Sequence, residues 1–252
     1  MNRFQVIIGQ ISLAVCALAL GLCICVFPVY PTALFSGWYA NVDESPLTQE
    51  ELVAFASSVH DYTFFDQDRT RFYAEIVQIN NHIVEDGRAS DGQPVITAGD
   101  VESVGAAFDA ADDAYVVHTD MVDHLDDVSR VVMIILIVGL VFLTIAATEI
   151  MNGYFRGYRG DMCRILVGGG MIALAIIAVA LVAGIFAFDG LFTGIHRLLF
   201  ADGTWTFSST SALICALPTE FWTAMGALLL AVAAIFAVIC IVIGKLVKNY
   251  KV

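Results

Sequence analysis

The chain has 252 residues, of which 59% are hydrophobic and 15% are charged. Soluble globular domains carry roughly 25% charged residues, so this composition argues against that class and favours a membrane protein. The net charge of -13 argues against a nucleic-acid partner, because nucleic acids attract basic surfaces.

Four apolar stretches are long enough to cross a hydrocarbon core of about 30 Å. They occupy residues 4–27, 131–151, 165–188 and 221–244, and Glu149 is the one charged residue within them. The first stretch is too long for the apolar part of a signal peptide and lacks a small-residue cleavage site, so we expect it to be retained. The sequence therefore predicts an all-α membrane protein with four transmembrane helices, organised as a single domain over residues 1–252.

Basic residues near the predicted spans indicate the orientation of the chain. Seven of the twelve basic residues fall on one side: Arg3, Arg156, Arg159, Arg164, Lys245, Lys248 and Lys251. We therefore expect both termini in the cytoplasm, and residues 28–128 and 189–220 as a mainly helical extracytoplasmic cap. Of the six cysteines, only Cys215 lies in these segments, so no disulfide framework of the tetraspanin or claudin kind is expected.

The longer extracytoplasmic segment carries helix signals. Thr48 and Glu51 have the spacing of a capping box, which predicts a helix from about Gln49, and the polar stretch 85–99 is typical of a loop. Asp100 is an expected N-cap for the apolar residues that follow at intervals of three and four. No proline interrupts residues 101–151, so we expect one continuous helix that runs into the second span.

Two histidines of this predicted helix differ in their surroundings. His118 lies on the apolar stripe, where a packed structural role is the usual one. His124 lies off the stripe and shares a helix face with Asp120 and Asp127, so either carboxylate could hold one nitrogen of its ring.

A short apolar segment, residues 191–200, follows the third predicted span. It is too short to cross a membrane, and we expect it to lie in the interface, where His196 and Arg197 meet lipid headgroups at the same membrane face as His124. Trp205 and Phe207 are expected as interfacial anchors. One alternative remains open at this point, a metal site formed by His124, Asp127 and His196.

These residues carry a resemblance to a known family. The sequence reads His-Leu-x-Asp-Val at residues 124–128, immediately before the second span, and His-x-x-x-Phe at residues 196–200. Trp-x-Phe at 205–207 and Leu-Pro-x-x-Phe at 217–221 follow before the fourth span. With four spans and a long first outer segment, this pattern resembles the bacterial lipoprotein intramolecular transacylases.

The resemblance implies an activity. Such enzymes move the sn-2 acyl chain of a diacylglyceryl lipoprotein to the α-amine of its N-terminal cysteine, which leaves a lyso-form lipoprotein. His124 and His196 match the family's two functional histidines, and we expect them to act jointly as general base and general acid. Asp127, or less favourably Asp120, would orient His124.

The remaining expectations concern ligands, partners and location. We expect Arg197, Phe200 and Trp205 to contact substrate lipid, with Arg197 a further candidate for stabilising the oxyanion. No cofactor is implied, and the partners are diacylated lipoproteins and membrane lipids at the outer face of the bacterial cytoplasmic membrane. The rival hypotheses are a metal-dependent membrane ester hydrolase and a non-enzymatic four-span protein that binds lipoproteins.

Overall fold

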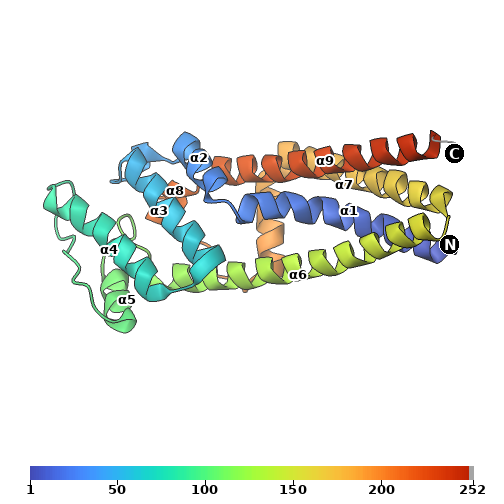
Figure 1. The fold of residues 1–252 in the computed structure, drawn as a ribbon. Coiled ribbons are helices and arrows are strands. Elements are labelled where there is room, and N and C mark those ends of the chain that lie inside the picture. Colours follow the sequence, from blue (N-terminus) through green and yellow to red (C-terminus); the bar gives the residue numbers. More distant parts are fainter. Residues whose placement is uncertain (250–252) are drawn as a thin grey trace. The chain divides into compact units, whose positions relative to one another are not determined.

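The computed structural model describes residues 1–249, which form helices and no strand (Figure 1). Lys251, one of the basic residues used to predict the orientation, lies outside the described residues. The chain divides into two compact units. The first, the membrane unit, comprises residues 1–25, 132–191 and the chain from Gly226 onward, and the second unit comprises residues 26–131 and 192–225. The single-domain organisation stays a prediction.

Among residues 1–249, four helices are long and apolar enough to cross a membrane, as the sequence predicts. They are α1 (Arg3–Val26), α6 (Thr119–Phe155), α7 (Arg159–Leu199) and α9 (Thr219–Asn249). Small residues let α1, α7 and α9 approach closely, with Ala14 and Ala173 buried in one cluster. A Cβ atom added at Gly21 would overlap the carbonyl group of Leu229, so α1 and α9 come close enough there to require glycine.

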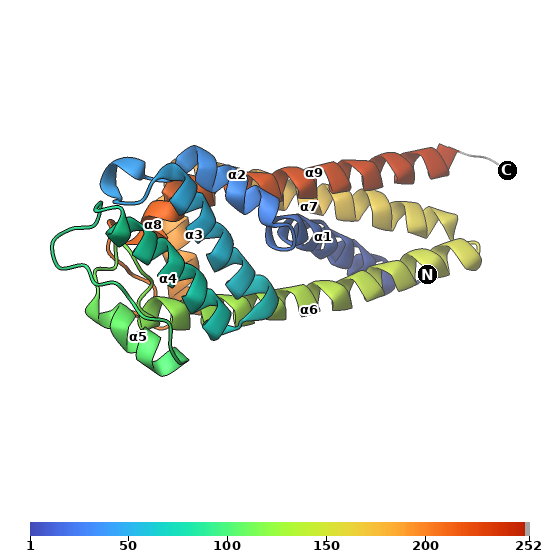
Figure 2. The same ribbon diagram turned by 60° about the vertical axis from the view of Figure 1, so that its left-hand side comes forward.

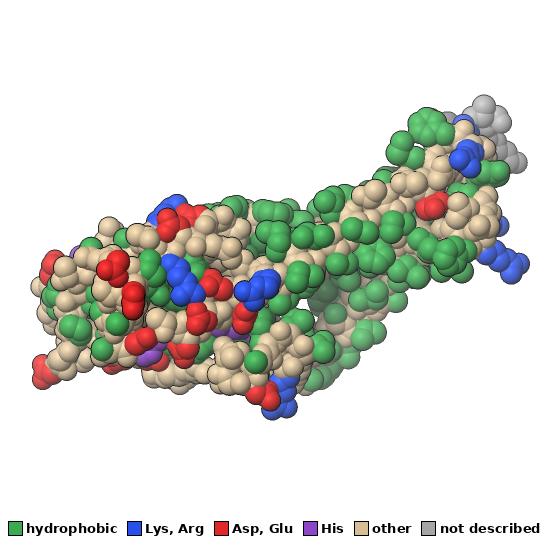
Figure 3. Space-filling model, turned by 90° about the horizontal axis from the view of Figure 1, so that it is seen from below, with side chains coloured by type: hydrophobic (Ala, Val, Ile, Leu, Met, Phe, Trp, Pro, Cys, Tyr) green, Lys and Arg blue, Asp and Glu red, His purple; other side chains and the backbone are tan. Residues whose placement is uncertain are grey.

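The basic ends of the membrane-unit helices lie together. The α-amino group of Met1 forms an ion pair with Asp161 at 2.9 Å, and the side chain of Gln10 donates to the carbonyl of Arg164 at 2.9 Å. These contacts join the start of α1 to the start of α7. Figure 3 shows lysine and arginine side chains at this end of the unit, beyond an apolar surface. The basic residues of these segments are expected on one side of the membrane, and the contacts between the starts of α1 and α7 agree with that expectation.

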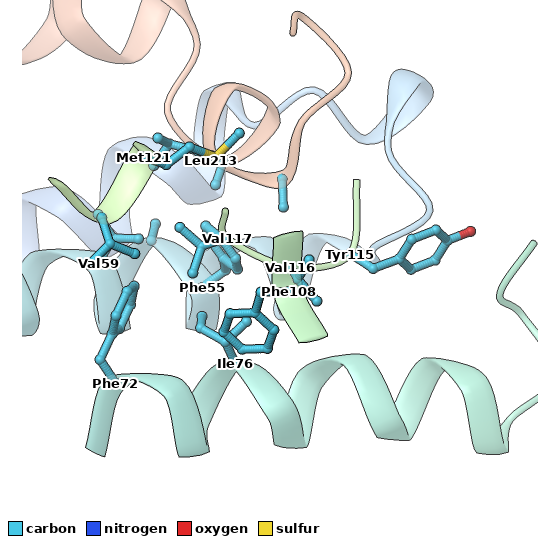
Figure 4. Packing of buried hydrophobic residues seen from close by; sticks show 14 of the residues in the cluster. Phe55, Val59, Phe72, Ile76, Phe108, Tyr115, Val116, Val117, Met121 and Leu213 are labelled. Atoms are coloured by element: carbon cyan, nitrogen blue, oxygen red, sulfur yellow. The ribbon is translucent and has the colours of Figure 1, made fainter. Parts of the chain in front are cut away.

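The second unit has a core of its own. Besides α2 (Val29–Tyr39) and η1 (Val42–Glu44), it contains α3 (Gln49–Asp61), the π-helical turn η2 (Tyr62–Asp66), α4 (Arg69–Glu85), α5 (Val101–Ala110) and α8 (Ala212–Ala216). Helices α3 and α4 pack side by side (Figure 2). Figure 4 shows Phe55 of α3, Ile76 of α4 and Phe108 of α5 meeting in the core.

Local signals in this unit behave as predicted. Thr48 and Glu51 form both hydrogen bonds of a capping box at the start of α3. Asp100 caps α5 by accepting from the backbone of Ser103 at 2.9 Å. Helix α4 ends at Glu85, and the stretch up to Asp100 is irregular, as expected of a polar loop.

The continuous helix predicted from Val101 to Met151 is wrong. Helix α5 ends at Ala110, and α6 begins only at Thr119. The intervening turn buries Tyr115, Val116 and Val117 together, which one helix face cannot do because successive residues are about 100° apart. Aspartates stabilise the break: Asp112 accepts from the backbone of Ala114 at 3.0 Å, and Asp109 accepts from the backbone and hydroxyl of Thr119 at 2.8 and 2.7 Å.

Candidate functional site

His124 occupies the second turn of α6, before the apolar stretch that begins at residue 131. Its side chain is buried, with 8% of the residue exposed. Three rings surround it: Phe200 at 4.8 Å, Phe207 at 5.7 Å and His196 at 6.0 Å between ring centroids. The two histidines that the sequence separates by 72 positions, 124 to 196, therefore lie beside each other within the second unit.

His196 is held by its own helix. Helix α7 departs from helical geometry at Ala187, and the segment that follows it carries His196 in its last turn. The Nδ1 atom of His196 lies 2.8 Å from the carbonyl oxygen of Phe192. Because a carbonyl only accepts, Nδ1 must carry the hydrogen, and in the neutral ring the lone pair is then on Nε2. This backbone contact fixes the tautomer and the ring orientation of His196.

Aromatic side chains enclose the histidine pair. Phe192, Phe200 and Trp205 lie 4.0, 5.4 and 5.1 Å from the His196 ring between centroids. Phe200 and Trp205 thus lie beside the histidine pair, and their contact with substrate lipid stays a prediction. Phe192 is an addition that sequence reasoning missed, although its spacing of four from His196 and eight from Phe200 places all three on one helix face.

Burial changes the acid–base behaviour of His124. Burial, and to a smaller extent the neighbouring His196, lower the pKa of the ring from 6.5 to about 4, although the charge of Asp127 partly opposes them. The Nδ1 atom of His124 is buried, and no hydrogen-bond partner for it is found among residues 1–249. The site therefore contains a neutral imidazole with one unsatisfied nitrogen at physiological pH.

Neither aspartate makes the hydrogen bond that the helix spacing predicts. Asp127 instead accepts from Arg130 at 2.6 Å, on the outer surface of α6. Asp120 accepts from the backbone of Met121 at 2.8 Å, as a carboxylate in the first turn of a helix commonly does. Asp127 consequently acts on His124 through its charge and not through contact.

The metal alternative gains no geometric support. Within the described part of the chain, no three His, Cys, Asp or Glu side chains are grouped so that they could hold a metal ion. Arg197, one position beyond His196, has an exposed side chain, so contact with lipid remains a prediction for it.

The three other histidines lie away from this pair. The Nε2 atom of His118 is 3.1 Å from the carbonyl of Ala111, in the turn between α5 and α6, which fits the structural role predicted for it. His60 is buried, with Nε2 at 3.0 Å from the carbonyl of Val26. His82 is exposed on α4 beside Glu51.

The sequence also matches a known protein family. The model of the family described as lipoprotein intramolecular transacylase Lit matches residues 7–222, which is most of the chain. The chain belongs to this family. It is therefore a membrane acyltransferase that acts on lipoproteins, and the family resemblance drawn from the sequence is confirmed.

Solved structures agree with the fold. The membrane-integral Lit of Bacillus cereus is similar over 99% of this chain and 96% of its own, with a TM-score of 0.70 and 16% sequence identity. Two further structures of the Bacillus cereus protein, each with one histidine replaced, have TM-scores of 0.66 and 17% identity, and cover 99% of this chain and 92% and 94% of theirs. A comparison with curated proteins gives no significant match.

Proposed function

We propose that this member of the family transfers the sn-2 acyl chain of a diacylglyceryl lipoprotein to the α-amine of the lipid-bearing cysteine, by acid–base catalysis at His196 and His124. One observation carries the proposal. Two imidazoles from distant parts of the sequence lie 6.0 Å apart between centroids, and the backbone bond of His196 leaves its Nε2 free to take a proton.

The reaction requires a neutral amine, because the α-ammonium, with a pKa near 8, has no lone pair. We assign His196 as the general base. Its Nε2 takes a proton from the amine nitrogen as that nitrogen forms a bond to the ester carbonyl carbon. The carbonyl electrons move to the oxygen, which gives a tetrahedral intermediate.

The second half of the reaction returns the proton. The intermediate collapses, the bond from the carbonyl carbon to the glyceryl oxygen breaks, and that oxygen takes up a proton. We assign its delivery to His124, which receives the proton from His196. Because its pKa is low, protonated His124 is a strong donor. The products are an amide and a glyceryl hydroxyl, so no acyl-enzyme is needed.

The experiment follows one acyl chain. The purified enzyme is incubated with a diacylated lipopeptide, and tandem mass spectrometry locates each chain. Transfer leaves the total mass unchanged and puts one chain on the cysteine nitrogen. With His196→Ala or His124→Ala, conversion should fall by at least about a hundredfold, the scale of lost acid–base catalysis. The exposed His82→Ala is the matched control and should keep the wild-type rate.

Acetylation of the lipopeptide amine separates transfer from hydrolysis. The blocked substrate has no nucleophile, so a transacylase leaves it unchanged. If free fatty acid appeared and the mass fell by one acyl group, the enzyme would be an ester hydrolase and our proposal would be wrong.

We also propose that both termini are cytoplasmic and that the histidine pair faces the outer side of the bacterial cytoplasmic membrane. The cluster of basic side chains at one end of the membrane unit supports this orientation. In a background without native cysteines, Asp91→Cys and Asp202→Cys, both exposed positions, should react with an impermeant maleimide in intact cells. Reaction only after lysis would reverse the orientation.

A further inference from the structure

Trp205 is placed beside the histidine pair by a turn. After α7 ends, the carbonyl of Ala201 accepts from the backbone and the hydroxyl of Thr204, at 3.3 and 2.9 Å. Gly203 has a φ of +86°, which favours glycine, although a Cβ atom there would meet nothing within 4 Å. The turn reverses the chain and brings the indole to 5.1 Å from the His196 ring between centroids.

The indole N–H of Trp205 is a buried donor without a hydrogen-bond acceptor among residues 1–249. An indole N–H is a donor only, and leaving it buried without an acceptor costs free energy. The rings packed around His196 are mainly phenylalanines, which offer no oxygen. The carbonyl oxygen of an ester that enters the site would supply such an acceptor.

We propose that Trp205 is a catalytic residue whose indole N–H donates a hydrogen bond to the carbonyl oxygen of the scissile ester. This inference rests on the proposed function. The bond strengthens when the amine adds to the carbonyl carbon and the oxygen becomes an anion, and it weakens again when the glyceryl oxygen departs. The indole proton is not transferred. Trp205 is better placed for this role than Arg197, whose side chain is exposed.

The test changes one atom. Incorporation of 3-benzothienylalanine at position 205 replaces the indole N–H by sulfur and keeps the shape of the ring. We expect kcat to fall about a hundredfold, the usual effect of removing one oxyanion donor, while KM changes much less. Trp205→Phe should lose at least as much. Trp38→Phe, at an exposed position in α2, should keep the wild-type kcat and serves as the control for tryptophan replacement.

A second readout separates catalysis from packing. If Trp205 only supported the histidines, the isostere would keep the full rate, because it fills the same space. The pKa of His124, measured by NMR, should be the same with tryptophan or its isostere at position 205. A wild-type kcat for the isostere, with wild-type enzyme producing the N-acyl lipopeptide, would overturn the role of Trp205 alone. Failure of the wild-type enzyme to form that product would overturn the proposed function, and this inference with it.

Discussion

Protonation of His124 should require unusually acidic solution. Burial among aromatic rings, together with the neighbouring His196 and against the charge of Asp127, lowers the pKa of its imidazole from 6.5 to about 4. That difference of about 2.5 units corresponds to about 3 kcal/mol in favour of the neutral ring, at about 1.4 kcal/mol per unit. At pH 7 only about one molecule in a thousand should carry a proton on this residue, so the ring is neutral in the resting enzyme.

The assay is a histidine NMR titration of the isotope-labelled enzyme in detergent micelles. The His124 signal is identified by its loss in His124→Phe, which keeps an aromatic ring among its neighbours. We expect its midpoint near pH 4, and a rise in that midpoint with His196→Gln, because the variant removes the neighbour that disfavours a second positive charge. A midpoint near 6.5 in the wild-type enzyme would refute the argument from burial.

The same shift links pH to stability. Between about pH 4 and 6.5 the unfolded chain binds a proton at His124 and the folded chain does not, so this residue makes folding less favourable as the pH falls through that window. The penalty is absent above pH 6.5 and reaches its full value of about 3 kcal/mol below pH 4. His124→Phe should accordingly lose less thermal stability than the wild type between pH 6.5 and 4.

Three further outcomes are expected. Asp127→Asn should lower the pKa of His124 further and reduce kcat by less than about tenfold, because the carboxylate acts through its charge. A loss of kcat as large as that of His124→Ala would mean that Asp127 contacts and orients the His124 ring during the reaction. Burial alone would raise the pKa of Glu51, but hydrogen bonds from an arginine and from the capping residue lower it to about 2, so its contribution is present above pH 4.5 and is lost as the pH falls toward 2. Glu51→Gln should cost about 2 kcal/mol at pH 7 by thermal unfolding, and Glu50→Gln, at an exposed neighbouring position, almost nothing. His118→Ala should lower yield and thermal stability and leave kcat unchanged in the folded fraction.

The spans could be predicted because bilayer thickness acts on sequence directly. A run of about 20 apolar residues has few alternatives, and the capping box of α3 is likewise a local signal. The break before α6 could not be found in the same way. Asp109 and Thr119 are ten positions apart, and Val116 and Val117 are buried by helices distant in sequence. Periodicity alone favoured continuing the helix.

In the candidate site, too, some features could be predicted from the sequence and others could not. His124, His196, Phe200 and Trp205 could be predicted because the family pattern places them, and the structure brings them together. The partner of Asp127 could not be predicted, because His124 and Arg130 each lie three positions from it along the helix. Helix spacing allows both contacts. Arg130 is charged and near the surface, so the ion pair forms without burying the carboxylate, whereas a bond to His124 would draw it among aromatic rings.

The aromatic enclosure explains how one pair of imidazoles could favour transfer over hydrolysis. Water and an amine compete for the same ester carbonyl, and the histidines would activate either. Rings within 4.0 to 5.7 Å of the two imidazoles offer water few hydrogen-bonding partners, while the amine arrives tethered to the molecule that carries the ester. The same burial keeps His124 neutral and leaves the Trp205 N–H without an acceptor among residues 1–249. Replacing a ring by a polar side chain, as in Phe207→Gln, should therefore raise the ratio of released fatty acid to N-acyl product. An unchanged ratio in that variant would mean that substrate tethering alone sets the outcome.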